Sequence, residues 1–236
     1  MSDASILFSG GPDSTLAALY ALEKFDRVHL LTYHHKLMYR TGRHITVVQE
    51  MRKIFGNDRI IGHEENIDPN YKICYFKDIS KYIKKYRTYY IPWLCGACKM
   101  VMHFSTINYN RKFKISTTYD GANMESAPIF PAQTQEYISV IKDLYKSYKM
   151  EYECPIYEVT GTDKETEKFG LTTTKDTKKE HIFFSTQHSC FVGLLLHAHA
   201  RFYYRPIRGR KRMSQISSIF LKEMIDNCRS LLPEVE

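Results

Sequence analysis

The sequence predicts an α/β protein built on a doubly wound parallel sheet. Apolar runs typical of buried strands alternate with helical periodicity through the first 62 residues, and a glycine-rich loop joins the first strand directly to the first helix. The composition agrees, because 43% hydrophobic and 25% charged residues in a chain of 236 are ordinary globular values. Wholesale disorder, collagen and coiled coil are thereby excluded.

The first half of the chain carries the regular pattern. Short apolar runs predict strands, apolar residues three and four apart predict helices, and Gly56 is a helix stop signal. The expected order is strand 4–8, helix 13–24, strand 27–33, helix 43–55 and strand 58–62. Strands and helices alternating at this spacing indicate parallel strand pairing.

The rest of the chain is less regular. We expect helices over 75–90, 96–108, 134–146 and 214–232, a fourth strand over 113–119, a loop over 120–133 and a polar surface excursion over 160–180. No convincing linker interrupts these segments. The prediction is therefore one domain, residues 1–236, with a decorated C-terminal third.

Net charge and hydropathy limit which partners and which cellular compartment can be expected. The chain has 34 basic and 26 acidic residues, a net charge of +8, which favours anionic partners such as nucleotides or RNA. Its longest apolar run, residues 190–196, is far shorter than the ~20 residues of a membrane span. The N-terminus lacks the basic and apolar regions of a signal peptide. We expect a cytoplasmic protein with no membrane partner.

The strongest local signal is the sequence SGGPDST at residues 9–15, called here the phosphate loop. Its two glycines let the backbone approach a ligand closely, and amides at the start of a helix bind anions. The hydroxyls of Ser9 and Ser14 add donors, and Asp13 could hold Mg²⁺ against phosphates. The loop has no Gly-Lys-Ser/Thr, so it is not a Walker loop.

The phosphate loop resembles the PP-loop of the N-type ATP pyrophosphatases. This superfamily includes GMP synthetase, asparagine synthetase, the tRNA thiolation enzymes and 7-cyano-7-deazaguanine synthase. The resemblance implies an adenine nucleotide alpha-hydrolase-like fold and cleavage of ATP between its α- and β-phosphates. AMP would be attached to a substrate oxygen, and a nitrogen or sulfur nucleophile would then displace it.

Three further stretches are similar to this superfamily. Residues 28–33 look like the strand whose end lies beside the adenine, and residues 116–126 are similar to a Thr-Gly-x-Asn-x-Asp-like segment. Residues 154–166 resemble a late Pro-Leu and Lys-x-Glu stretch. The resemblance thus covers residues 4–195, which leaves 196–236 as a basic segment and a closing helix.

The resemblance also implies a set of site residues. Asp13 and Lys164 would be catalytic, with Asp13 holding Mg²⁺. The implied contacts to ATP or pyrophosphate are Ser9, Gly10, Gly11, Asp13, Ser14, Thr15, Thr32, Tyr33, Thr118 and Asp120.

The six cysteines do not form the pattern of a disulfide framework. Cys95 and Cys98 open a predicted helix at a spacing that lets two thiolates reach one metal or cluster. Together with Cys190 they are similar to the iron–sulfur tRNA thiolation enzymes, in which three cysteines hold a [4Fe–4S] cluster with one iron open for a sulfur donor. The resemblance implies these three as cluster ligands, with Cys190 also catalytic. Zinc, with His188 or His103 as a fourth ligand, and the absence of any metal remain open.

The sequence departs in one respect from the pattern of the 7-cyano-7-deazaguanine synthase family. The layout near residue 190 is also similar to 7-cyano-7-deazaguanine synthase, but the cysteine-rich zinc run of that family is missing here. Cys74 and Cys228 are expected in the core, as is Cys154, which could alternatively be a catalytic thiol. The cations of residues 201–212 fit either phosphate contacts along RNA or a solvated basic loop.

The resulting prediction is an enzyme that uses ATP to adenylate a carbonyl oxygen of a nucleobase-like small molecule or of tRNA. Sulfur transfer with a [4Fe–4S] cluster is the first expectation for the second step, and nitrogen transfer as in 7-cyano-7-deazaguanine synthesis is the alternative. A non-catalytic nucleotide-binding module is a third reading. The expected partners are ATP, the acceptor, a sulfur or nitrogen donor and, in a homodimer, a second copy of the chain.

Overall fold

The computed structural model describes residues 2–36, 38–39, 42–74, 79–86, 92–127, 130–171, 189–190 and 210–232. Its centre is a five-stranded sheet in the order β4-β2-β1-β5-β6, in which all neighbouring strands are parallel. The strands are β1 (Asp3–Leu7), β2 (Arg27–His34), β4 (Ile60–Asn66), β5 (Thr117–Asp120) and β6 (Glu151–Glu153).

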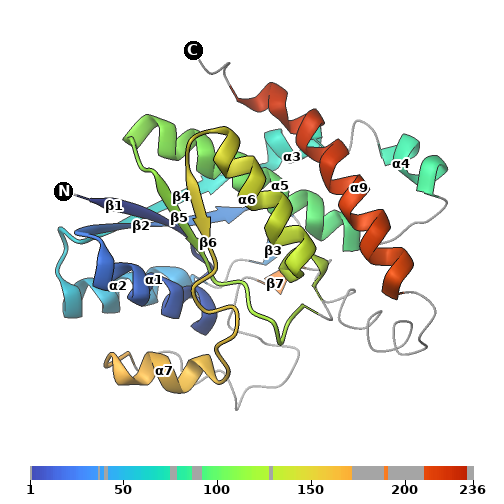
Figure 1. Cartoon of the computed structure of the whole chain (residues 1–236). Coiled ribbons are helices and arrows are strands. Elements are labelled where there is room, and N and C mark those ends of the chain that lie inside the picture. The colour runs from blue at the N-terminus through green and yellow to red at the C-terminus, as the bar shows by residue number, and fades with distance from the viewer. Residues whose placement is uncertain are drawn as a thin grey trace.

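Helices cover both faces of the sheet (Figure 1). On one face lie α1 (Pro12–Lys24), α2 (Arg43–Phe55) and α7 (Thr162–Lys168), and on the other α5 (Pro92–Phe113), α6 (Gln135–Ser147) and α9 (Arg210–Cys228). The predicted doubly wound α/β fold is therefore confirmed.

The central strands are apolar throughout because both of their faces are buried. In β1, Ile6 belongs to the core beneath α1 and α2, whereas its neighbour Leu7 belongs to the core beneath α5, α6 and α9. Leu30 and Leu31 of β2 divide between the two cores in the same way. Side chains alternate across a strand, so a doubly covered strand needs an apolar residue at nearly every position.

Several predicted boundaries differ from the structure, among them those of the closing helix, which was predicted over 214–232 and is α9 at Arg210–Cys228. The third strand of the sequence prediction is β4, and it begins and ends later than predicted because it is an edge strand whose side chains alternate between half-buried and exposed. The α5 helix continues through Phe113 to Lys114, whose positive φ of 58° ends it, so β5 starts only at Thr117. The helix predicted over 134–146 is α6, capped by the Thr134 side chain, which accepts from the Tyr137 amide.

Several short elements were not predicted. They are α3 (Asp68–Cys74), strand β6, helix α7 inside the predicted surface excursion, and the antiparallel pair of β3 (Met38–Tyr39) with β7 (Ser189–Cys190). The segments η2 (Pro131–Gln133) and η4 (Arg229–Leu231) are 3₁₀ turns. Of the helix predicted over 75–90, the structure describes α4 (Ile79–Tyr86); the remainder lies outside the described residues, as does 201–209 of the basic segment.

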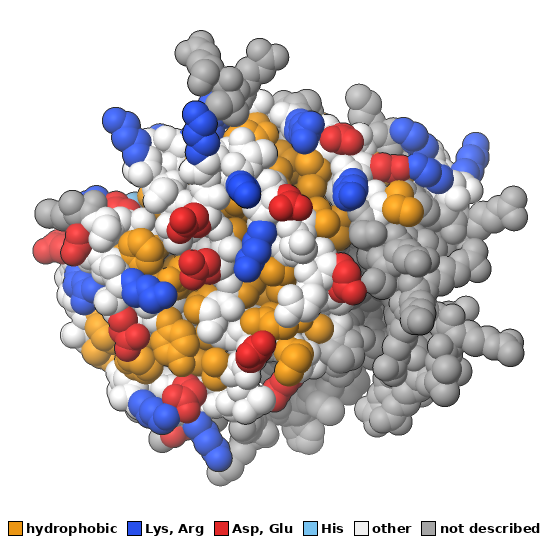
Figure 2. All heavy atoms as spheres, viewed as in Figure 1, with side chains coloured by type: hydrophobic (Ala, Val, Ile, Leu, Met, Phe, Trp, Pro, Cys, Tyr) orange, Lys and Arg blue, Asp and Glu red, His pale blue; other side chains and the backbone are white. Residues whose placement is uncertain are grey.

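The surface of the described part of the chain is mixed in character. Figure 2 shows basic and acidic side chains interspersed with apolar ones over the face that is turned to the viewer in Figure 1. The net positive charge is therefore not gathered into one patch among the described residues of this face. Among the residues that the structure describes, no helix has the length and apolar character needed to cross a membrane.

Candidate functional site

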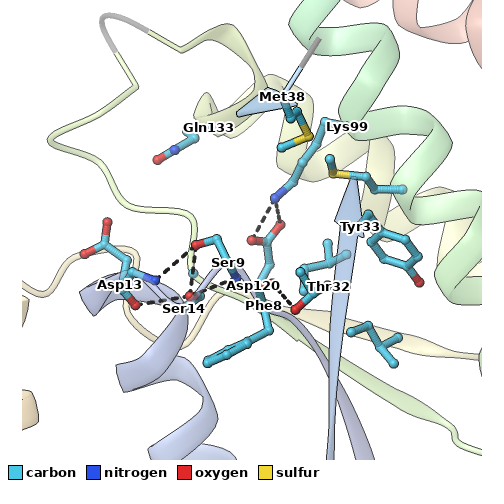
Figure 3. Close-up of a pocket in the computed structure, with 15 residues that line it drawn as sticks. Phe8, Ser9, Asp13, Ser14, Thr32, Tyr33, Met38, Lys99, Asp120 and Gln133 are labelled. Atoms are coloured by element: carbon cyan, nitrogen blue, oxygen red, sulfur yellow. Dashed lines mark hydrogen bonds and ion pairs between the residues drawn. The ribbon is translucent and has the colours of Figure 1, made fainter. Parts of the chain in front are cut away.

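A pocket of about 200 Å³ opens at the carboxyl ends of the parallel strands (Figure 3). After β1, the chain adds β2 and β4 on one side of that strand and then β5 and β6 on the other side. The switch point therefore lies between β1 and β5, and ligands of open α/β sheets bind at such a point. The described residues that line the pocket are Leu7, Phe8, Ser9, Gly11, Asp13, Ser14, Leu31, Thr32, Tyr33, Met38, Lys99, Met102, Asp120, Gly121 and Gln133.

The phosphate loop is held in shape by its own hydroxyl groups. The Ser14 hydroxyl donates to the Gly11 carbonyl at 3.1 Å and accepts from the Ser9 amide at 3.2 Å. Because the single proton of Ser14 is used in this way, the Ser9 hydroxyl must be the donor in its 3.1 Å contact with Ser14. The Ser9 oxygen in turn accepts from the Gly11 amide at 3.3 Å. The loop is therefore ordered before any ligand arrives.

Two glycines allow neighbouring backbones to close around the loop. Gly10 has φ +75°, and a Cβ there would lie 2.7 Å from the Cα of His44, at the start of α2. A Cβ on Gly121 would lie 2.6 Å from the backbone nitrogen of Ser14. The loop after β5 thus packs directly on the first turn of α1, where an alanine would not fit.

Asp13 is held from two sides by segments distant in sequence. One carboxylate oxygen accepts from the Asn123 side-chain amide and the other from the Thr162 hydroxyl, both at 2.6 Å. Asn123 follows β5, and Thr162 begins α7, which packs on α1. A carboxylate offers about four acceptor sites, so these two bonds are compatible with a divalent cation as an additional partner.

An ion pair between the half-buried Lys99 and the buried Asp120 lies in the pocket. The Lys99 ammonium, from α5, lies 2.9 and 2.7 Å from the two oxygens of Asp120, at the end of β5, and the Tyr152 hydroxyl donates to Asp120 at 2.7 Å. Burial alone would raise the pKa of Asp120, but the charge of Lys99 and these hydrogen bonds outweigh it and lower the pKa. Asp120 is therefore a carboxylate at neutral pH.

Figure 3 shows how the groups are arranged. Asp120 lies between the phosphate loop on one side and Thr32 and Tyr33 on the other, and Lys99 reaches it from α5. The Thr32 hydroxyl donates to the Phe8 carbonyl at 3.0 Å, which ties the end of β2 to the loop. The pocket is thus lined by the phosphate loop, the Lys99–Asp120 pair and apolar side chains.

The structure brings together most of the residues predicted for ATP binding. Ser9, Gly11, Asp13, Ser14, Thr32, Tyr33 and Asp120 all line the pocket, and Gly10 shapes its loop. Three predicted residues are placed elsewhere. Thr15 is buried inside α1, Thr118 is buried in the sheet, where its hydroxyl accepts from Asn110 at 2.8 Å, and Lys164 is exposed on α7.

Four side chains of this region were given no role at the sequence level. They are Lys99, Asn123, Gln133 and Thr162. Two of them had a local signal, because Asn123 occupies the Asn position of the Thr-Gly-x-Asn-x-Asp-like segment and Lys99 directly follows Cys98. Gln133 and Thr162 reach the site only through the fold, since the loop and helix that carry them have ordinary polar sequences.

The cysteines predicted as metal ligands are not among the described residues that line the pocket, but residues next to them are. Cys95 and Cys98 are half-buried on α5, and Lys99 beside them lines the pocket. The backbone of Cys190 pairs with Met38, which also lines the pocket, but the Cys190 side chain lies outside what the structure describes. Among described residues no group of three metal-ligating side chains is found, so the convergence of the three sulfur atoms stays a prediction.

The other cysteines are part of the protein interior. Cys74 on α3 and Cys228 on α9 are buried in one core cluster, where the sequence analysis expected them. Cys154 packs against the same cluster close to Asp120, and burial raises the pKa of its thiol to about 12. A protonated thiol is a poor nucleophile, which disfavours the alternative of Cys154 as a catalytic residue.

Comparison with solved structures identifies one similar fold and one weaker likeness. A 4-thiouridine synthetase, crystallised with RNA and ATP, superposes with a TM-score of 0.59 at 16% identity over 97% of this chain and 53% of that one. The U34-tRNA thiolase NcsA of Methanococcus maripaludis, solved with its [4Fe-4S] cluster, gives 0.46 at 14% identity over 100% and 73%. The present chain thus spans about half the length of the 4-thiouridine synthetase chain, and the likeness to it concerns the fold alone.

Comparison of the sequence gives a more specific result. No curated protein matches significantly. A family model, however, matches residues 3–195, which include the phosphate loop, the pocket and the whole central sheet. The chain therefore belongs to the family described as queuosine biosynthesis protein QueC, within the PP-loop superfamily.

Proposed function

We propose that this protein uses ATP to adenylate an oxygen of a 7-deazaguanine-type base and that ammonia then displaces the AMP. The observation that carries the proposal is the position of the phosphate loop. Its ordered amides, hydroxyls and Asp13 face the same pocket as an apolar wall that can accept a base. The family match supports a 7-deazaguanine as the acceptor and nitrogen as the transferred atom.

If the product is a nitrile, as in 7-cyano-7-deazaguanine, the oxidation level of its carbon indicates which group the acceptor carries. A nitrile carbon has the same oxidation level as a carboxylic acid, so no oxidant is needed if the acceptor carries a carboxylate. The carboxylate oxygen attacks the α-phosphorus and pyrophosphate leaves; ammonia then attacks the acyl carbon, and AMP leaves with that oxygen, giving an amide. The amide oxygen then attacks the α-phosphorus of a second ATP and pyrophosphate leaves; the amide nitrogen loses its two protons and AMP leaves with that oxygen, which yields the nitrile.

The chain's residues bind and orient the ATP in this scheme. The amides at the start of α1 and the hydroxyls of Ser9 and Ser14 would contact the phosphates that become pyrophosphate. Asp13, oriented by Asn123 and Thr162, would hold Mg²⁺, which neutralises charge on the leaving pyrophosphate. Thr32 and Tyr33 would lie beside the base.

The direct test is acceptor-dependent release of pyrophosphate from ATP. The purified chain is mixed with ATP, Mg²⁺ and 7-carboxy-7-deazaguanine, with either ammonium or sulfide as the nucleophile. We expect pyrophosphate and AMP, and an amide or nitrile product by mass spectrometry with ammonium. Absence of AMP formation with this acceptor under both conditions would refute the proposal.

Sulfur transfer is the second candidate, and the cysteines favour it. Cys95 and Cys98 are half-buried and lie four residues and one residue before pocket-lining Lys99, and the Cys190 backbone pairs with pocket-lining Met38. Two thiols three residues apart on a helix fit a shared metal, so a cluster or zinc ion would be held here, and a cluster would supply a sulfur-carrying iron. A thiocarboxylate product with sulfide, and no amide or nitrile with ammonium, would select this candidate.

A further inference from the structure

We propose that Lys99 binds the carboxylate of the acceptor and so makes the pocket selective for an anionic substrate in the first of the two adenylations. This inference rests on the proposed function. It concerns the Lys99–Asp120 pair. The binding of ATP alone does not explain why this pair lies in the pocket.

Lys99 is the one cation among the described residues that line the pocket. Its side chain is 24% exposed, whereas that of Asp120 is 4% exposed. The ammonium carries three N–H donors, and its contacts with the two Asp120 oxygens account for two of them. A third donor on a partly exposed lysine side chain in a pocket is suited to an incoming anion.

The pair is poorly explained as a packing device. Its neighbours in the pocket include Leu7, Leu31 and Met102, among which two apolar side chains would pack without the cost of desolvating two charges. Asp120 also receives the Tyr152 hydroxyl, so its carboxylate is fixed on two sides. This arrangement fixes the position of the Lys99 ammonium, as a binding group requires.

The charge is needed at one chemical step in particular. A carboxylate must approach the α-phosphate of ATP, which is itself anionic, and a fixed cation between them offsets the repulsion. The amide formed in the first round is neutral and has no such repulsion. Lys99 should therefore favour the first adenylation far more than the second.

The experiment compares two acceptors, 7-carboxy-7-deazaguanine and 7-carbamoyl-7-deazaguanine, in the parent and two variants. Lys99→Met alone would leave Asp120 buried without its counter-charge and destabilise the fold, so the informative variant is the double substitution Lys99→Met with Asp120→Asn. Asp120→Asn alone keeps the cation and tests the loss of the carboxylate. Pyrophosphate release gives kcat/KM for each acceptor, and thermal unfolding checks that each variant is folded.

We expect the double variant to lose about 10- to 100-fold in kcat/KM for the carboxylate acceptor, the loss typical of a hydrogen bond to a charged group, through a higher KM. The loss for the neutral amide should be at least about 10-fold smaller, because any effect of Asp120 on ATP binding is shared by both acceptors, and Asp120→Asn should keep the parent's ratio between the two acceptors.

Two results would overturn the inference without touching the proposed function. Full activity of the double variant with both acceptors would mean that Lys99 only neutralises Asp120, and equal losses with both would mean a structural role. If the parent released pyrophosphate with neither acceptor, the proposed function would fail, and this assignment of Lys99 with it.

Discussion

Asp13 is the residue at which three distant segments meet. It lies in the first turn of α1, and its carboxylate accepts from Asn123 after β5 and from Thr162 at the start of α7. Its position is therefore fixed by the fold as a whole, although its neighbours in sequence already identify it as a candidate metal ligand.

Replacing Asp13 by Asn should abolish most activity without unfolding the protein. The substitution removes the negative charge offered to Mg²⁺, and we expect pyrophosphate release to fall about 100- to 1000-fold. Asn123 can still donate to the new side-chain oxygen, and the Thr162 hydroxyl can rotate to accept from the new amide, so the melting temperature should change little. The matched control is Thr162→Val, which removes one hydrogen bond but keeps the charge and should cost far less activity. Release at the parent rate in Asp13→Asn would show that Asp13 holds no metal.

His103 makes the stability of the protein depend on pH. It is fully buried on α5 against Tyr145 and Tyr152, and burial lowers its pKa from 6.5 to about 3. Above pH 6.5 the imidazole is neutral in both the folded and the unfolded chain. Below pH 6.5 the imidazole is protonated in the unfolded chain but stays neutral in the folded chain. The free energy of unfolding should therefore fall between pH 7 and pH 5, by about 2 kcal/mol from this residue.

The pH effect can be measured by urea unfolding at pH 7 and pH 5. His29 and His35 also have pKa values lowered by burial and act in the same direction, so His103→Gln should reduce the pH dependence without removing it. An unchanged difference between the two pH values in His103→Gln would contradict this account.

At the scale of the elements, Gly10 determines how closely α2 approaches the phosphate loop. Gly10→Ala would combine a positive φ with a Cβ 2.7 Å from the His44 backbone, whereas a Cβ on Gly42, which has φ +68°, would meet no described atom within 4 Å. We expect Gly42→Ala to cost about 1 kcal/mol and Gly10→Ala about 1–3 kcal/mol more, with loss of ATP binding. Denaturant unfolding and ATP titration check both variants; equal effects would mean that the contact with α2 is unimportant.

A helix or strand could be predicted from the sequence where it is buried through apolar side chains. The strands β1 and β2 are covered on both faces and therefore appear as apolar runs, and α6 shows clear periodicity with a threonine cap. The strand β6, with the sequence Glu-Tyr-Glu, and α7, with TDKETEK, carry no such pattern. The buried Thr162 and Thr166 of α7 pack through short polar side chains, which a hydrophobic pattern cannot reveal.

The same distinction applies to the site. The phosphate loop was predictable because the strand, loop and helix that form it are contiguous in sequence. Thr118 was predicted to contact ATP but is buried in the sheet, because it lies two residues before the carboxyl end of β5, where Asp120 reaches the pocket. The Lys99–Asp120 pair joins residues 21 apart on different elements, and its geometry required the packing of α5 on the sheet.

At the scale of the whole molecule, the strand order places the pocket where loops after β1 and β5 meet, and it brings α5 with its two cysteines to the same edge. This placement permits either nitrogen or sulfur chemistry. Anaerobic purification followed by iron and zinc analysis tests the sulfur candidate: about four irons per chain, lost in Cys95→Ser and Cys98→Ser variants, would be expected of a cluster. Metal content unchanged by both substitutions would contradict the predicted role of these thiols.

In the proposed reaction an acceptor oxygen attacks the α-phosphorus of ATP. The most direct measurement uses 7-carboxy-7-deazaguanine labelled with ¹⁸O in its carboxylate, together with ATP, Mg²⁺ and ammonium. We predict that ¹⁸O appears in the AMP, because the adenylated oxygen leaves with AMP when ammonia attacks. Formation of ADP and phosphate, or of AMP without the label, would contradict the claim.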